Sequence, residues 1–226
     1  MVPNRISIWL MSLLLWGSSC AGPEATNTKV SNVFGGMTEM NNDSNEQGLA
    51  IATFGAGCFW CTEAQFQQLK GVVTVESGYS GGHVENPTYK AVCSGTTGHA
   101  EVTQIRYDPS VISFDELLEA FFISHDPTQL NRQGNDVGTQ YRSVVFYHSE
   151  EQKEKANYYI DKLDQEKAYS SKIVTEVSPF TVFYKAEDYH QDYYSLNKSE
   201  PYCMFVVKPK LEKFQKVFSK KLKNSN

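Results

Sequence analysis

Between residue 49 and residue 206 the sequence alternates apolar, β-branched runs with helical patterns, and no linker or repeat interrupts it. We expect strands at 49–56, 72–79, 101–107, 141–148 and 173–184, with Pro179 interrupting the last of them. Helices are expected at 58–70, 113–124 and about 149–168. Helices alternate with only a few strands, which favours an α/β (α+β) fold. We expect a two-layer sandwich with a mixed sheet and a ferredoxin-like core.

Three of the expected helix ends carry recognisable signals. Gly71 follows the first helix, as glycine commonly does at a helix C-terminus. Ser113 and Glu116 have the spacing of a capping box at the start of the second helix. Ser149 is a suitable N-cap for the third. The helix positions are therefore better defined than the order of the strands.

The segment Gly57-Cys58-Phe59-Trp60-Cys61 joins the first strand to the first helix. A cysteine at a helix N-terminus lies near free N–H groups and the positive end of the dipole, which lower its pKa and make it a nucleophile. Cys61 lies one helical turn further on the same face. Helical neighbours are ~5–6 Å apart at Cβ, and a disulfide needs ~3.5–4.5 Å. A small adjustment would therefore let the two thiols form a disulfide.

Other interpretations of this segment remain open. Zinc would need two further ligands, but Cys93 and Cys203 are isolated and the five histidines show no ligand spacing, so we predict no metal. Two buried core cysteines are possible, although the helix-start position disfavours them. A thioredoxin-like thiol exchanger also fits, but it usually carries small residues between its cysteines. The intervening aromatic residues belong either to the core or to the wall of a pocket for a small apolar group.

The first 20 residues resemble an export signal. Arg5 is followed by an apolar stretch from Ile6 to Trp16 and by small residues before Cys20. Cys20 resembles the lipid-modified cysteine of a bacterial lipoprotein, although Gly17 stands where an aliphatic residue is usual. Ordinary cleavage nearby is the alternative. We therefore expect export to the cell envelope, as a periplasmic protein or a lipid-anchored one.

Residues 21–47 are rich in Gly, Asn, Thr and Ser without apolar periodicity, so we expect a flexible tether. Residues 48–226 are expected to form a single domain. It ends in a lysine-rich amphipathic helix after Pro209, in which Leu211, Phe214, Phe218 and Leu222 recur at helical spacing. A docked helix with a solvated lysine face is favoured over a membrane-surface or partner-binding helix. The net charge of −5 argues against nucleic acid as a partner.

Several blocks of the chain match one family. Residues 57–64 resemble the signature of the A-type peptide methionine sulfoxide reductases, which reduce the S epimer of the sulfoxide. Further matching blocks are 77–82, 86–89, 92–95, 98–102, 134–143 and 189–191. The resemblance covers about residues 50–207. It identifies the domain as a member of this family.

The resemblance implies roles for individual residues. Cys58 matches the nucleophile that attacks the sulfoxide sulfur, and Glu101 matches the acid that protonates its oxygen. On its strand Glu101 shares a face with residues 103, 105 and 107, and partly apolar surroundings would raise its pKa. The remaining matches are the substrate-methyl residues Phe59 and Trp60, the tyrosines that hydrogen-bond the sulfoxide oxygen, Tyr89 and Tyr141, and a loop aspartate, Asp136.

The family implies that the oxidised nucleophile is resolved by a second thiol and then reduced by an external thioredoxin-like dithiol, without a bound cofactor. Members with a Gly-rich C-terminus carry two recycling cysteines there, whereas this chain has one, Cys203. Cys61 and Cys203 are therefore both candidates, and Cys61 is favoured. Cys93 is expected to be a buried bystander. We expect a monomeric repair enzyme for oxidised methionine in proteins; a thiol–disulfide exchanger and a non-catalytic binding lipoprotein are the alternatives.

Overall fold

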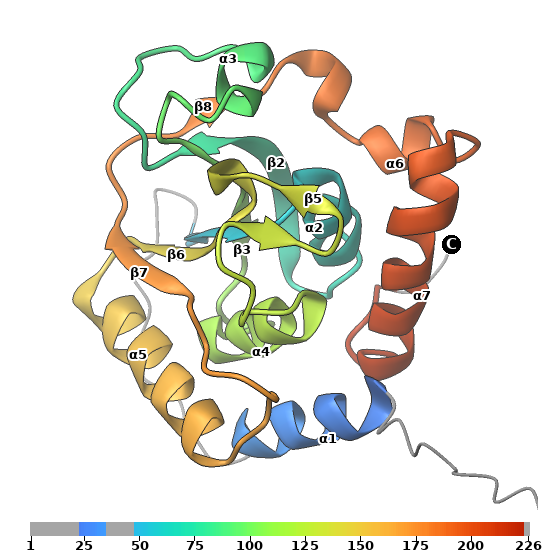
Figure 1. Ribbon diagram of the computed structural model, residues 1–226. Helices are drawn as coiled ribbons and strands as arrows, with labels where there is room; N and C mark the ends of the chain where they lie inside the picture. Colours follow the sequence, from blue (N-terminus) through green and yellow to red (C-terminus); the bar gives the residue numbers. More distant parts are fainter. Residues whose placement is uncertain (1–22, 35–47, 224–226) are drawn as a thin grey trace, which may run out of the picture.

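Six strands form one mixed sheet in the computed structural model, which describes residues 23–34 and 48–223 (Figure 1). The strand order is β7-β6-β1-β3-β2-β8, and all neighbours are antiparallel except β6 and β7. The strands are β1 (Ala50–Ala56), β2 (Val72–Ser80), β3 (Ala100–Tyr107), β6 (Ser143–Tyr147), β7 (Glu176–Pro179) and β8 (Tyr184–Lys185). A separate short hairpin pairs β4 (Arg132–Gln133) with β5 (Asp136–Val137).

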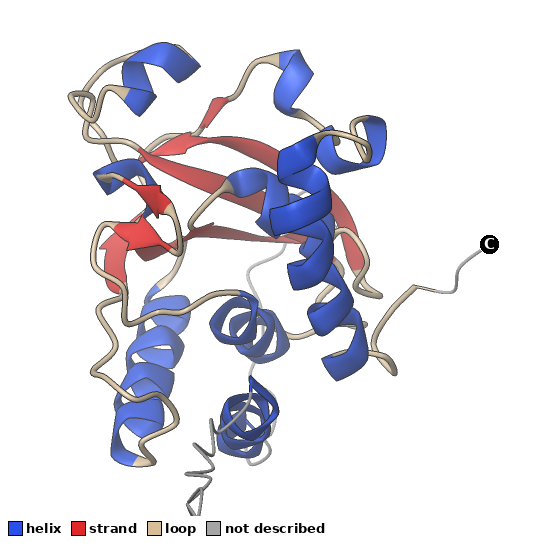
Figure 2. Ribbon diagram, turned by 45° about the vertical axis from the view of Figure 1, so that its right-hand side comes forward, coloured by secondary structure: helices blue, strands red, loops and turns tan. Residues whose placement is uncertain are grey.

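The four central strands have the order β6-β1-β3-β2, with α2 (Phe59–Phe66) between β1 and β2 and α4 (Phe114–Ser124) between β3 and β6. This βαββαβ arrangement confirms the expected ferredoxin-like core. In Figure 2, α4 and α5 (Glu150–Gln165) lie on the same side of the sheet, below the strands. The expected mixed-sheet α/β fold is therefore confirmed.

Alternation along β3 decides which side chains face the helices. Ile105 and Tyr107 belong to the main core with the phenylalanines of α4, whereas Ala100 and Val102 belong to a smaller cluster on the opposite face. By the period of two, Glu101 lies on the same face as Ile105. The helix-covered face of one strand thus carries the core at one end and a carboxyl group at the other.

The predicted starts of α2, α4 and α5 are accurate, whereas the predicted end of α2 is not. The capping box is complete, because the Glu116 N–H donates to Ser113 Oγ at 3.2 Å and the Ser113 N–H donates to Glu116 Oε2 at 2.9 Å. Ser149 caps α5 through the Gln152 N–H. Helix α2 ends at Phe66 rather than at residue 70, and a turn follows that closes at Gly71 with φ +85°.

The expected strand region 173–184 divides into two strands at opposite edges of the sheet. β7 pairs with β6 and ends at Pro179, which has no N–H to continue the ladder. Phe180 and Phe183 pack on the cluster that contains Phe146. The chain then pairs again as β8 beside β2. The proline interruption is therefore a crossover from one edge of the sheet to the other.

The C-terminal helix α7 (Lys208–Val217) is docked, as predicted. Leu211, Phe214 and Phe218 are buried, and Leu222 lies beyond the helix in a bridge with Leu69. The helix begins earlier than expected, because a π-helical turn, Cys203–Val207, precedes it without a break. None of the helices in the described part of the chain is long and apolar enough to span a membrane.

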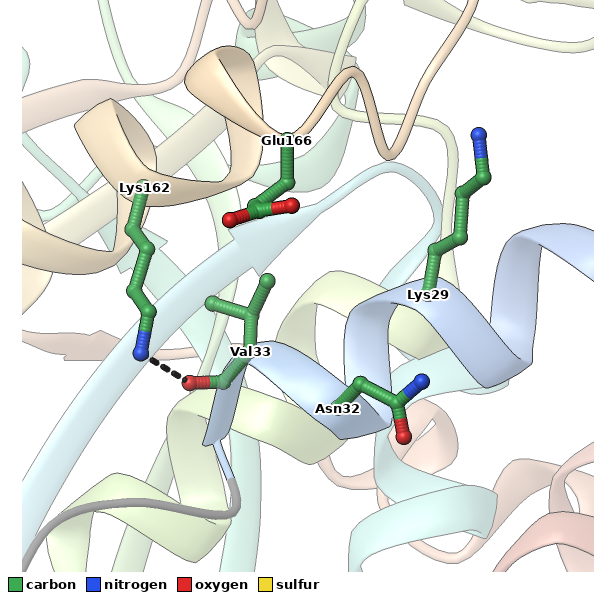
Figure 3. A pocket seen from close by; sticks show the side chains of 5 residues that line it. All are labelled: Lys29, Asn32, Val33, Lys162 and Glu166. Carbon is green, nitrogen blue, oxygen red and sulfur yellow. Dashed lines mark hydrogen bonds between the residues drawn. The ribbon is translucent and has the colours of Figure 1, made fainter.

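Part of the expected tether is helical. Residues 23–34 form α1 (Pro23–Phe34), whose Val30 and Val33 are buried against α4 and α5, and Phe34 stacks on Tyr159 with ring centroids 3.8 Å apart. The Lys162 ammonium donates to the Val33 carbonyl at 2.8 Å, beside a pocket of about 250 Å³. Figure 3 shows this hydrogen bond and the residues that line the pocket. The flexible-tether prediction is wrong for these residues, because the apolar positions of α1 find a partner surface.

The remaining predictions for the N-terminal part concern residues outside the described ranges. They are the signal at 1–20, Cys20 and the tether at 35–47.

Candidate active site

Cys58 is the N-cap residue of α2, directly after the first strand. The chain turns at Gly57 with φ +88°, and a Cβ there would meet the Gln133 side chain at 2.6 Å. Glycine is therefore required by both the backbone and the space. The Cys58 carbonyl accepts from the Cys61 N–H at 3.1 Å and from Thr62 Oγ1 at 3.2 Å. The helix start thus holds the Cys58 backbone in place without a side-chain cap.

The Cys58 sulfur is buried and hydrogen-bonds to three groups. These are the Cys61 thiol, the Tyr202 hydroxyl and the Trp60 N–H of the helix start. Burial raises the pKa of the Cys58 thiol well above its usual value, and Cys61 adds to this; the Tyr202 and Trp60 contacts lower the pKa by less. The prediction of a lowered pKa from the helix start alone is wrong, because desolvation outweighs the helix contribution.

Two further thiols lie beside Cys58. Cys61 is one turn along α2, and its hydrogen bond from Cys58 lowers its pKa despite burial, with Lys210 contributing in the same direction. Cys203 is fully buried in the same cluster as Cys58 and Cys61. The structure therefore brings both sequence candidates for a resolving thiol to the nucleophile, with all three cysteines free.

Glu101 faces Cys58 across the start of α2. It is 1% exposed, and its Oε2 accepts the Phe59 N–H at 3.1 Å. Burial raises the pKa of this carboxyl group well above its usual value, and the neighbouring Cys58 raises it further. The direction of this shift is the one expected for a carboxyl group in apolar surroundings. A buried acid and a buried thiol therefore share one pocket.

An aromatic wall adjoins the two groups. The Trp60 ring stacks on Tyr193 at 3.7 Å, and the Phe59 ring lies 5.0 Å from the ring of His190. Trp60 Nε1 donates to His190 Nδ1 at 3.2 Å, which fixes the indole and assigns the ring proton of His190 to Nε2. Sequence reasoning gave His190 no role, although it lies in a family block. Its role here is to orient Trp60.

Tyr89 and Tyr141 lie at the acid side of the pocket. Tyr89 begins α3 (Tyr89–Cys93), and its N–H donates to Glu187 Oε1 at 2.9 Å, while Tyr79 donates to Oε2 of the same carboxylate. Tyr141 ends the 3₁₀ turn η1 (Thr139–Tyr141) and packs against the Cys58 cluster. Burial, followed by Glu101, raises the pKa of both phenols, so both stay protonated.

Asp136 reaches the site from the β4–β5 hairpin. Its Oδ2 accepts the Tyr202 hydroxyl at 2.8 Å, and its charge raises the pKa of Glu101. Tyr202 was missed at the sequence level. The available signal was its position directly before Cys203, one of the two candidate resolving cysteines.

Two other residues lie close to the site without joining it. Cys93 is exposed at the end of α3 and hydrogen-bonds to the Tyr89 hydroxyl, so the expectation of a buried bystander is wrong. His99 accepts the Gly82 N–H at 3.0 Å and contacts the Val84 carbonyl at 2.7 Å, which braces the turn after β2. Within residues 23–34 and 48–223 no group of three or more His, Cys, Asp or Glu side chains could hold a metal ion.

Comparisons with known proteins agree with this geometry. Residues 50–222 match the family model described as peptide methionine sulfoxide reductase. The chain is 58% identical over 175 residues to peptide methionine sulfoxide reductase MsrA of Saccharolobus solfataricus, covering 77% of this chain and 98% of that protein. It is 60% identical over 173 residues to the MsrA of Sulfolobus acidocaldarius, covering 76% and 97%.

Solved structures show the same likeness. Reduced Mxr1 from Saccharomyces cerevisiae is 34% identical with a TM-score of 0.66, covering 74% of this chain and 96% of that one. Methionine sulfoxide reductase A of Corynebacterium diphtheriae is 36% identical with a TM-score of 0.62, covering 69% and 78%. The chain belongs to the A-type peptide methionine sulfoxide reductases, a family of oxidoreductases.

Proposed function

We propose that this enzyme reduces methionine S-sulfoxide in proteins, and free methionine S-sulfoxide, and so repairs oxidised methionine. The Cys58 thiolate attacks the sulfoxide sulfur, the oxygen passes to Cys58, and methionine leaves while Cys58 becomes a sulfenic acid. A second thiol attacks that sulfur, releasing water and forming a disulfide. An external thioredoxin-like dithiol reduces the disulfide and is itself oxidised.

The observation that carries this proposal is the buried Glu101 carboxyl group beside Cys58. Oxygen is a poor leaving group on sulfur until it is protonated, so the reaction needs an acid within reach of the nucleophile. Burial raises the pKa of Glu101, and its Oε2 is held by the Phe59 N–H at 3.1 Å. A carboxyl group in this position can give its proton to the sulfoxide oxygen as the new bond to sulfur forms.

The aromatic wall is the proposed seat of the substrate side chain. Phe59 and Trp60 would hold the methyl group, and sulfur–aromatic contacts of this kind contribute ~0.3–1.5 kcal/mol. The phenols of Tyr89 and Tyr141 would donate to the oxygen without bringing a charge into the pocket. Asp136 is the weakest member of the proposed set, ordering water or assisting the step that forms the disulfide.

Cys61 is the proposed resolving cysteine. It already hydrogen-bonds to Cys58 and its pKa is lowered, so it is the readier of the two nearby thiols to attack a sulfenic acid. After one turnover without reductant, the trapped disulfide should map to Cys58 and Cys61 by mass spectrometry. A Cys58–Cys203 linkage would show that the fully buried thiol of the π-helical turn resolves the intermediate instead.

A dabsylated methionine S-sulfoxide assay with dithiothreitol tests the overall function. The parent enzyme should turn the S epimer over, the R epimer should be inert, and Cys58→Ser should abolish turnover. The matched control is Cys93→Ser, which removes the exposed thiol and should retain activity. Insulin reduction without sulfoxide turnover would point to a thiol exchanger, and inactivity in both assays would leave a binding protein.

We also propose that the enzyme is exported, with Cys20 as a lipid attachment site, and that it is monomeric. The support for export and lipidation is the pattern of residues 1–20. Fatty-acid labelling that is lost in Cys20→Ala is the expected result. Label that persists in this variant would contradict the anchor. Sedimentation at the mass of a single chain is the expected result for the oligomeric state.

A further inference from the structure

Tyr202 lies between two hydrogen-bonding partners in the wall of the pocket. Its hydroxyl donates to Asp136 Oδ2 at 2.8 Å, and the residue packs on the cluster that contains Cys58, so that the Cys58 sulfur lies within reach of the same hydroxyl. Its ring meets Trp60 edge-on, with centroids 5.7 Å apart and an interplanar angle of 76°. The residue stands directly before the π-helical turn Cys203–Val207, and such turns often occur at functional sites. Packing therefore fixes the ring while the hydroxyl proton remains free to turn.

The number of protons limits what this hydroxyl can do. A phenol has one O–H and can donate to only one partner at a time. In the resting pocket that proton is given to Asp136. Cys58 needs no donor while it is a thiol, because its own S–H can act as the donor. A buried thiolate does need donors, since burial penalises its charge.

We propose that Tyr202 is a positioning residue whose single hydroxyl proton turns from Asp136 to Cys58 when the nucleophile ionises, so that Asp136 and the thiolate compete for it. This inference rests on the proposed role of Cys58. It implies that Asp136 disfavours ionisation of Cys58 in the resting enzyme, whereas Tyr202 favours it. No bond is made or broken; one hydrogen bond replaces another.

Other ionisable groups face Cys58 from the surrounding elements and contribute a constant background. They are Cys61, Glu101, Cys93, Tyr141, Tyr193 and Cys203. Asp136 and Lys210 act on Cys61, with opposite signs. Cys61 raises the pKa of Cys58, whereas the Tyr202 hydroxyl and the Trp60 N–H lower it. Tyr202 is thus the neighbouring side chain whose hydrogen bond favours the ionised sulfur.

The test is the pH dependence of Cys58 alkylation by iodoacetamide in the reduced full-length protein. Peptide mass mapping separates modification of Cys58 from that of Cys61. Tyr202→Phe should slow alkylation at pH 7 about tenfold and move the inflection up by about one pH unit, since it removes a hydrogen bond to a charged group. Asp136→Asn should move the inflection down. Tyr194→Phe, a tyrosine packed on the same cluster, should leave the profile unchanged.

The double variant separates competition from simple charge. If the two residues compete for one proton, Asp136→Asn should have a smaller effect in the Tyr202→Phe background than alone. An effect of equal size in both backgrounds would overturn the proposal. So would an unchanged profile in folded Tyr202→Phe, or an upward movement in Asp136→Asn. If Tyr202→Phe does not fold, an unchanged or upward inflection in Asp136→Asn still overturns the proposal. Alkylation needs no sulfoxide, so the result can be read even if the proposed function fails.

Discussion

The two helices of the ferredoxin-like core, α2 and α4, pack on the same face of the same sheet but begin differently. Helix α4 starts with a complete capping box between Ser113 and Glu116. Helix α2 has Cys58 at its N-cap and no side-chain cap; its first N–H groups go to Glu101 and to the Cys58 sulfur instead. One helix start serves stability, and the other gives its free N–H groups to reactive side chains.

The residues that the two helices bury near their starts differ in the same way. The core side of α4 is formed by residues such as Leu117, Leu118 and Phe121, all fully buried. The start of α2 buries Cys58, Cys61 and Glu63. Buried ionisable groups oppose folding when they must carry a charge. A cost of this kind at a functional site is expected, and the core around α4 offsets it.

Replacing the proposed acid, Glu101, should have the largest effect. This effect should be on catalysis at the start of α2. Glu101→Gln removes the proton donor while keeping the shape of the side chain, so kcat/KM for the S-sulfoxide should fall ~10²–10⁴-fold. Alkylation of Cys58 should continue. In the parent enzyme, activity that depends on the protonated carboxyl group should decline as the pH rises above the raised pKa of Glu101. Normal turnover in Glu101→Gln would show that the acid is a different group.

Truncating a core side chain of α4 should instead lower the stability of the protein and leave catalysis almost unchanged. Leu118 is fully buried in the main core, so Leu118→Ala should cost about 2–5 kcal/mol of unfolding free energy, measured by urea denaturation. The kcat/KM of the fraction that remains folded should stay within about twofold of the parent value. A large loss of kcat/KM in folded Leu118→Ala would show that the two helices are coupled.

The pH dependence of stability should separate the two helices by the sign of the effect. Burial lowers the pKa of His125, at the C-terminus of α4, to about 4. The contribution of neutral His125 to stability is therefore fully present above about pH 6.5 and is lost as the pH falls towards 4. Burial raises the pKa of Glu63, in α2, to about 7, so its contribution is present below about pH 4.3 and is lost as the pH rises through 7. Each loss is about 3 kcal/mol.

Two variants assign these limbs in urea denaturation at several pH values. The two pH windows overlap between about pH 4.5 and 6.5 with opposite signs. In this range Glu63→Gln should leave a stability that rises with pH, and His125→Asn should leave one that falls with pH up to about 7. Both substitutions remove the titration while leaving polar atoms in place. A profile between pH 4.5 and 7 that is the same in Glu63→Gln as in the parent would assign this loss of stability to another group.

The smallest effect should come from the capping box. Ser113→Ala removes the acceptor of the Glu116 N–H, and such losses cost about 1 kcal/mol. Turnover should be unchanged, because the start of α4 makes no contact with the reactive groups. A matched substitution at the start of α2, Thr62→Val, removes the hydroxyl that donates to the Cys58 carbonyl at 3.2 Å. Thr62→Val should lower kcat/KM, whereas Ser113→Ala should not.

The sequence was most informative where local rules apply. The capping box at Ser113, the cap at Ser149 and the strand alternation that places Glu101 with Ile105 all appear as predicted. These features depend on residues close together in the chain, so a short window contains the whole physical cause. The split of 173–184 into two strands at opposite edges, and the helix within the expected tether, depend on surfaces far away in sequence.

The same distinction holds in the active site. The sequence by itself determined the reactive segment, because Gly57 and the helix start define how Cys58 is presented, and it determined the family through matching blocks along the chain. The protonation of the pocket was decided by tertiary structure. Burial raises the pKa of Cys58 against the effect of its own helix, and burial depends on which distant segments close over the site. Tyr202, from the far end of the chain, is the clearest case, because only folding brings its hydroxyl between Asp136 and the sulfur.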